Sequence, residues 1–157
     1  MKKGFTFIEL IIVVAIMLVL SVAIIANYNS YTDRERVRQT GLTIKSDLRL
    51  VASKVNAGVK SAACITLVSY DVSFTTACTG GQSCYTITPR CSNGLLSGEQ
   101  TKVSIPKELQ IQSANQTIRF LPLSAGTDLT TDAIITLGGV SAVYHVKISP
   151  SGTISDY

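Results

Sequence analysis

A carboxylate near the start of a long apolar segment is the residue whose chemistry most needs an explanation. The segment from Phe5 to Ala26 contains Glu9 as its single charged residue, with Thr6 and Ser21 as the other polar positions. A charge at bilayer depth costs about 2.5 to 3.5 kcal/mol on insertion scales, so it persists where a partner compensates it. We therefore expect Glu9 to pair with a cation. The alternative is that Glu9 lies at the membrane interface of an ordinary anchor.

Four cysteines close together form a second group with possible chemistry, either disulfide formation or metal binding. They are Cys64, Cys78, Cys84 and Cys91. Outside the cytoplasm such cysteines form disulfides, and we favour Cys64 with Cys78 and Cys84 with Cys91 because neighbouring cysteines close short loops. Zinc is the alternative, but the spacing lacks the C-x-x-C pairs of structural zinc modules, and we expect no metal.

Catalytic chemistry finds little support in the residues. His145 is the single histidine, and it lies on an alternating segment beside Lys147, where a structural role is expected. The sequence contains no nucleophile motif, glycine-rich phosphate loop or paired-carboxylate signature. Arg119 and Lys147 alone would make a poor phosphate-binding patch. We expect no catalytic residue, no cofactor and no enzymatic activity, and we do not expect nucleic-acid binding.

The apolar segment that carries Glu9 is long enough to cross a membrane. A helix of about 20 residues spans a hydrocarbon core of roughly 30 Å, and Phe5 to Ala26 reaches that length. Lys2 and Lys3 precede it, which predicts a cytoplasmic N-terminus and a head outside the cytoplasm. A cleaved secretory signal is the competing interpretation. However, no small-x-small site ends the segment, and ordinary signals lack an acid at this position.

The residues around the acid resemble a known processing site. Lys2-Lys3-Gly4-Phe5-Thr6-Phe7-Ile8-Glu9-Leu10 is similar to the cleavage and methylation signature of type IV prepilins and type II secretion pseudopilins. The resemblance implies that residues 1–4 are a leader, that a prepilin peptidase cleaves after Gly4, and that it methylates the new amino terminus at Phe5. It also implies that Glu9 pairs with the Phe5 amine of a neighbouring subunit, where each charge would lower the burial cost of the other.

The segment that follows is expected to continue as an amphipathic helix over residues 27–60. No proline occurs before Pro89, and Gly58 is a plausible stop signal. One helical stripe of apolar residues should dock on a sheet, and Gly41 within the pattern marks a flexible point. Basic residues here indicate either a solvated helix face or attraction to anionic head groups or an acidic neighbour. The stripe consists of Val37, Ile44, Leu48, Val51 and Val55.

Residues 61–157 change from a helical to an alternating pattern, which predicts an antiparallel β head with a disulfide-linked loop region at 64–91. Gly138-Gly139 predicts a two-residue hairpin turn, and Thr153 to Ser155 a short last strand. The fold class is therefore α+β, with a long N-terminal helix packed on a small antiparallel sheet, and the resemblance to prepilins implies that this architecture is pilin-like. The strands are expected at Ile65–Phe74, Tyr85–Thr88, Lys102–Ile105, Leu109–Ile111, Thr117–Leu121, Ala133–Leu137 and Ala142–Ile148.

A second resemblance concerns the end of the chain. Thr117 to Pro122, the Gly-Gly hairpin and Val146 to Gly152 are similar to the end of minor pseudopilin H. The two resemblances imply a minor subunit of a type IV pilus or type II secretion pseudopilus, first in the inner membrane as a single-pass protein and then in the fibre. The implied partners are other pilin subunits, the prepilin peptidase, the inner-membrane assembly platform and membrane lipid. The alternative is a membrane-anchored or fibre-tip module for adhesion or DNA uptake, with Thr79 to Gly98 as its contact surface.

Overall fold

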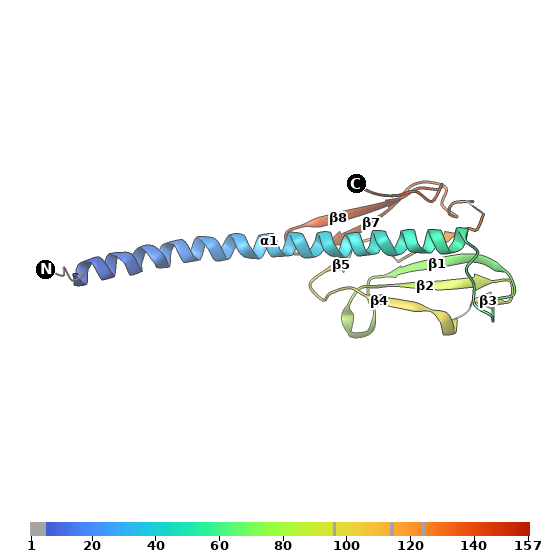
Figure 1. Ribbon diagram of the computed structural model, residues 1–157, viewed down its shortest axis with the longest axis horizontal. Coiled ribbons are helices and arrows are strands. Elements are labelled where there is room, and N and C mark those ends of the chain that lie inside the picture. Colours follow the sequence, from blue (N-terminus) through green and yellow to red (C-terminus); the bar gives the residue numbers. More distant parts are fainter. Residues whose placement is uncertain (1–5, 96, 114, 124) are drawn as a thin grey trace.

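The chain forms a long helix with a β-rich head packed along its C-terminal half (Figure 1). We describe a computed structural model that covers residues 6–157 apart from 96, 114 and 124, with the backbone alone at 22–27, 79, 95 and 97. The expected leader and the processing residues Gly4 and Phe5 lie outside the described residues.

Helix α1 runs from Phe7 to Asn56 without interruption, as the sequence predicts. Its 50 residues correspond to about 75 Å at 1.5 Å per residue. The helix ends at the cap residue Ala57, whose backbone N–H donates to the carbonyl of Ser53, and the next N–H, that of Gly58, donates to the carbonyl of Val55. Gly58 follows with φ of 64°, the left-handed conformation that ends many helices, so the predicted stop signal is confirmed.

The head contains two antiparallel sheets rather than one continuous sheet. In the first, β2 lies between β1 and two short strands, and β1 also pairs with β6. These strands are β1 (Leu67–Thr75), β2 (Cys84–Cys91), β3 (Gly94–Leu95), β4 (Thr101–Ser104) and β6 (Gln116–Phe120). The second sheet has the order β5 (Gln110–Ile111), β7 (Ala133–Gly138), β8 (Val143–Ile148) and β9 (Ile154–Asp156). Two short 3-10 helices, η1 (Thr79–Gly81) and η2 (Ser97–Glu99), complete the described elements.

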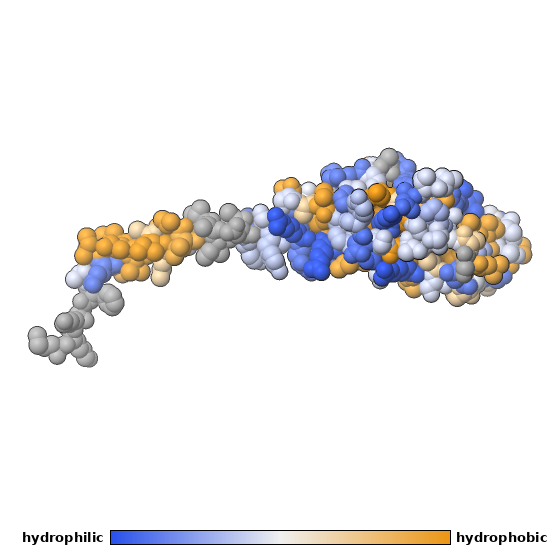
Figure 2. Space-filling model, turned by 90° about the horizontal axis from the view of Figure 1, so that it is seen from above, coloured by the Kyte–Doolittle hydropathy of each residue, from blue (hydrophilic) through white to orange (hydrophobic). Residues whose placement is uncertain are grey.

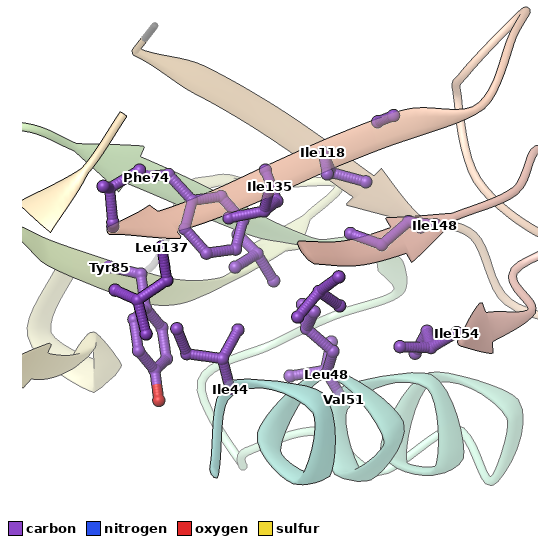
Figure 3. Close-up of a cluster of buried hydrophobic side chains, with 14 of the residues drawn as sticks. Ile44, Leu48, Val51, Phe74, Tyr85, Ile118, Ile135, Leu137, Ile148 and Ile154 are labelled. Atoms are coloured by element: carbon purple, nitrogen blue, oxygen red, sulfur yellow. The ribbon is translucent and has the colours of Figure 1, made fainter. Parts of the chain in front are cut away.

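The predicted apolar stripe of α1 forms one side of the core. Val37, Ile44, Leu48, Val51 and Val55 are all buried. Figure 3 shows Ile44, Leu48 and Val51 pointing from the helix toward apolar side chains of both sheets. Burial of this stripe joins the helix to the head through the hydrophobic effect and confirms the α+β, pilin-like fold. The facing residues include Phe74, Tyr85, Ile118, Ile135, Leu137, Ile148 and Ile154.

Gly41 has a packing role in this interface. The helix is regular at Gly41, and a Cβ atom there would collide with the aromatic ring of Tyr144 on β8. The structure therefore explains this glycine by close approach of the helix to the second sheet, instead of by the flexible point that we expected.

The turn between β7 and β8 differs from the prediction. Gly138 pairs with Val143, so residues 139–142 form the connection, and the predicted two-residue Gly-Gly turn is wrong. The N–H of Gly139 donates to the carbonyl of Ala142 at 2.8 Å and closes the turn. Asp33 of α1 accepts hydrogen bonds from this turn, which explains why the longer connection is stable.

The four cysteines form two disulfides, but the predicted pairing is wrong. The bonds join Cys64 with Cys91 and Cys78 with Cys84. The cause is the antiparallel pairing of β1 with β2. Cys64 precedes β1 and Cys91 ends β2, while Cys78 follows β1 and Cys84 begins β2, so the hairpin nests the shorter pair inside the longer one. The predicted loop region 64–91 is thus built around a two-stranded hairpin.

Candidate assembly surface of the N-terminal helix

The N-terminal part of α1 projects from the head and exposes apolar side chains on every side. Figure 2 shows this part as an almost continuous hydrophobic surface. The large apolar side chains between residues 7 and 20 are 45 to 78 % exposed. A helix that is apolar all round is normally buried in a core or a membrane, so this segment is available for contact with lipid or with other helices. The side chains are Phe7, Ile8, Leu10, Ile11, Ile12, Val13, Val14, Ile16, Met17, Leu18, Val19 and Leu20.

The expected membrane span, Phe5 to Ala26, falls only partly within the described residues. Phe5 lies outside them, and so do the side chains of residues 22–27. Within the described part of the chain, α1 contains no stretch that meets the length and hydropathy required of a membrane-crossing helix.

Glu9 lies in the first turn of α1, where it forms a capping box with Thr6. The backbone N–H and the hydroxyl of Thr6 each donate to Oε2 of Glu9 at 2.8 Å, and the Glu9 N–H donates to the Thr6 hydroxyl at 3.4 Å. This arrangement satisfies two helix N–H groups and puts a negative charge at the positive end of the helix dipole. Glu9 therefore already stabilises the start of its own helix within a single chain.

The capping role was missed in the sequence analysis, although its signal was present. Thr6 and Glu9 have the T-x-x-E spacing of a capping box directly before an apolar run. Both hydrogen bonds from Thr6 go to Oε2, and Oε1 of Glu9 has no hydrogen-bond partner among the described residues. The exposed carboxylate can thus accept a cation through Oε1 while it keeps the cap.

Two basic residues of the amphipathic helix segment bind the C-terminal strand of the head. Lys45 forms an ion pair with Asp156 at 2.5 Å, and Nη2 of Arg49 donates to the carbonyl of Ile154 at 3.1 Å. These contacts show that Lys45 and Arg49 attach β9 to α1. The sequence analysis had considered a solvated helix face, or attraction to anionic head groups or an acidic neighbour, for the basic residues of this segment. Arg34, Arg36 and Arg38 are exposed and have no salt bridge within the described part of the chain.

The remaining residues singled out in the sequence lie apart from the N-terminal segment. The Nδ1 atom of His145 lies 3.0 Å from the hydroxyl of Thr136, its cross-strand neighbour on β7. Lys147 forms an ion pair with Asp132 at 2.6 Å. Among the described residues, no three or more histidine, cysteine or acidic side chains are grouped so that they could hold a metal ion.

A buried aspartate in the first sheet was not found by sequence reasoning. Asp71 of β1 accepts hydrogen bonds from Nε and Nη2 of Arg90 at 2.9 and 2.7 Å and from the Ser69 hydroxyl at 2.8 Å. Arg119 of β6 lies 3.6 Å from the same carboxylate. The cluster joins three strands, and its pairing depends on their register. The sequence pattern gave no signal for it.

Comparison with known proteins bears on the N-terminal segment. Residues 1–25 match the family model described as the prokaryotic N-terminal methylation motif. No solved structure gave a significant match to the chain. The resemblance of the last strands to minor pseudopilin H stays a prediction. The chain carries the N-terminal signature of type IV pilin and pseudopilin precursors, joined to a pilin-like α+β fold.

Proposed function

We propose that this protein is a structural subunit, and a minor one, of a type IV pilus or type II secretion pseudopilus. The observation that carries the proposal is the exposed apolar segment of α1, which begins with a carboxylate inside a methylation motif. In this proposal the precursor enters the inner membrane with its head outside the cytoplasm. The prepilin peptidase then cleaves after Gly4 and methylates Phe5.

Assembly follows from the physical chemistry of that segment. Full burial of a large aliphatic or aromatic side chain contributes about 1.5 to 3 kcal/mol when the side chain leaves water, and lipid or like helices provide that burial. Within lipid the gain from helix contact comes from packing and polar pairing. The Phe5 amine of one subunit would approach Oε1 of Glu9 in its neighbour. This ion pair would fix the register between adjacent helices.

The proposal also defines the partners. The chain would contact other pilin or pseudopilin subunits, the inner-membrane assembly platform and membrane lipid, and it would serve as a substrate of the peptidase. It needs no cofactor and performs no catalysis itself. Its folded head, fixed to α1 by the apolar core, would be displayed on the fibre surface.

The experiment that tests this function replaces Glu9 with Gln in the native host and measures the subunit in purified fibres. Glutamine retains an oxygen that can accept the bonds from Thr6, so the helix cap is preserved while the charge is lost. Glu35→Gln is the matched control, since Glu35 lies on the same helix beyond the apolar segment and pairs with Gln39. Breaking a buried ion pair costs about 3 to 5 kcal/mol, which predicts a loss of incorporation of roughly 100-fold or more.

The membrane fraction and the mature terminus complete the test. The Glu9→Gln precursor should remain in the membrane at the wild-type level, while the Glu35→Gln variant enters fibres normally. Mass spectrometry of wild-type protein should find a chain that starts at Phe5 and carries one extra methyl group. Equal incorporation of Glu9→Gln and wild type, or an intact Met1, would contradict the proposal. A freestanding receptor would retain its surface function without Glu9.

A further inference from the structure

We propose that the tip of the β7–β8 hairpin, residues 139–142, docks in the phospholipid head-group layer beside Tyr28 and Tyr31 of α1. The proposed partner is the outer surface of the bilayer that holds the unassembled subunit. This inference rests on the membrane insertion in the proposed function. It adds a second contact with lipid, made by the head and not by the apolar segment.

The position of the tyrosines along α1 supports this placement. From Phe7 to Tyr28 the helix rises about 32 Å at 1.5 Å per residue, close to the roughly 30 Å of a hydrocarbon core. Tyr28 and Tyr31 are 66 and 68 % exposed. They lie one helical turn apart, where the chain would leave the membrane. Tyrosine is enriched at this depth because its ring is apolar and its hydroxyl is polar.

The hairpin tip lies at the same level of the molecule. Figure 1 shows β8 beginning beside the middle of α1, on the side of the head that faces the N-terminal segment. Val140 and Tyr28 line the same hollow, together with Asp33 and Ser141. The Val140 side chain is 88 % exposed, although it is apolar. An aliphatic side chain at the end of a turn, next to an exposed tyrosine, fits insertion among lipid head groups.

The tip is held rigidly in this position. Asp33 accepts hydrogen bonds from the N–H groups of Val140 and Ser141 at 3.2 and 2.7 Å. Gly139 packs so closely that a Cβ atom on it would collide with Val37 and Asp33. Insertion of α1 would therefore bring Val140 to the bilayer surface with little further loss of conformational freedom.

The charges near the tip favour a neutral lipid surface over a strongly charged partner. The hollow beside the tip carries charges of both signs, so no strong charge of one sign directs the tip toward an acidic or basic protein. We therefore expect docking on zwitterionic phospholipid without any need for anionic lipid. The charged residues that line this hollow are Arg36, Asp33 and Glu108.

The test uses tryptophan fluorescence, because the chain contains no tryptophan of its own. The full chain is reconstituted in vesicles of phosphatidylcholine and phosphatidylethanolamine that contain lipids brominated at shallow or deep positions. Three single variants are compared. Val140→Trp reports on the tip, Val14→Trp on the apolar segment, and Ile65→Trp on an exposed site beyond the C-terminal end of α1.

The inference predicts that shallow bromine quenches Val140→Trp at least about twofold more than Ile65→Trp. Deep bromine should quench Val14→Trp. If Val14→Trp is quenched and Val140→Trp behaves like Ile65→Trp, the docking inference is overturned while membrane insertion stands. If Val14→Trp is not quenched, insertion fails and the proposed function fails with it. A blue shift of Val140→Trp that grows with the protein-to-lipid ratio, without quenching, would assign the tip to a second copy and overturn the inference.

Discussion

Asp33 and Ser141 are 108 residues apart in the sequence, yet two hydrogen bonds join them. The backbone N–H and the hydroxyl of Ser141 donate to Oδ2 of Asp33 at 2.7 and 2.9 Å, and the N–H of Val140 donates to Oδ1 at 3.2 Å. These bonds attach the β7–β8 turn to the middle of α1. They supplement the apolar core at the end of the head nearest the N-terminal segment.

Removal of the Asp33 carboxylate should loosen this turn without unfolding the head. In Asp33→Ala the amides of Val140 and Ser141 lose their acceptor, so their hydrogen exchange should become faster. Exchange in the buried strands should change little, because the apolar core is untouched. Glu35→Ala, two positions further along the helix, is the control. Unchanged protection of Val140 and Ser141 in Asp33→Ala would show that the carboxylate does not hold the turn.

The same contact predicts a dependence on pH. Hydrogen bonds from the Ser141 backbone and hydroxyl hold the pKa of Asp33 below its ordinary value. A lowered folded-state pKa means that the unfolded chain takes up the proton first, at about pH 4. The contribution of Asp33 to stability is thus complete above that range and is lost as the pH falls through the lower folded value. Denaturant unfolding between pH 6 and 2 should show this loss in the wild type and a smaller loss in Asp33→Asn.

Features set by local periodicity could be predicted from the sequence. The stripe from Val37 to Val55 repeats with helical spacing, and its burial against the head is what that spacing predicts. Gly58 ended the helix as expected because a left-handed residue there needs no distant partner. The carboxylate of Glu9 was also recognised, although its local partner Thr6 was not.

Features set by contacts between distant residues could not be predicted. The cysteine pairs follow from the register of β1 on β2, which no spacing between cysteines encodes. The four-residue turn after Gly138 depends on Asp33, far away in the chain. Strand β2 continues through Pro89, although proline usually ends a central strand. On its outer side β2 pairs with β4 as far as Ile87 and with β3 from Arg90, so Pro89 lies between two ladders.

Substitution of Gly41 should destabilise the junction between helix and head. In Gly41→Ala the new methyl group meets the ring of Tyr144, and overpacking of this kind costs about 1 to 3 kcal/mol. The gain in helix propensity, about 1 kcal/mol, offsets part of that cost. Thermal or urea unfolding measures the net effect. The double variant Gly41→Ala with Tyr144→Leu should be more stable than Tyr144→Leu alone. If Gly41→Ala lowers the free energy of unfolding equally with and without the Tyr144 ring, the steric explanation is excluded.

The two disulfides should differ in their contribution to stability. Cys64–Cys91 closes a separation of 27 residues and Cys78–Cys84 one of 6, for which the chain-entropy relation gives about 3.6 and 2.2 kcal/mol. Paired alanine variants, Cys64→Ala with Cys91→Ala and Cys78→Ala with Cys84→Ala, should show this order in urea unfolding. Peptide mapping under non-reducing conditions tests the pairing itself. Recovery of a peptide that links Cys64 to Cys78 would contradict the structure.

The buried hydroxyl of Tyr85 should contribute measurably to the stability of the folded chain. Tyr85 is 1 % exposed, and its hydroxyl donates a hydrogen bond to Oδ2 of Asp47 on α1. In Tyr85→Phe the carboxylate loses this partner, and we expect a cost of about 1 to 3 kcal/mol in urea unfolding. Tyr144→Phe is the control, because its bond to Asp156 is exposed and 3.4 Å long, and it should change stability by less than about 0.5 kcal/mol.

The same tyrosine predicts sensitivity to high pH. Burial, together with the hydrogen bond to Asp47, raises the pKa of Tyr85 above its ordinary value. The contribution of the Tyr85 hydroxyl to the stability of the fold is therefore complete below about pH 10, where tyrosine in the unfolded chain begins to ionise. It is lost as the pH rises further. Unfolding measured between pH 8 and 11 should decline more steeply in the wild type than in Tyr85→Phe. If the two proteins decline in parallel, the Tyr85 hydroxyl is not the group whose ionisation opposes folding.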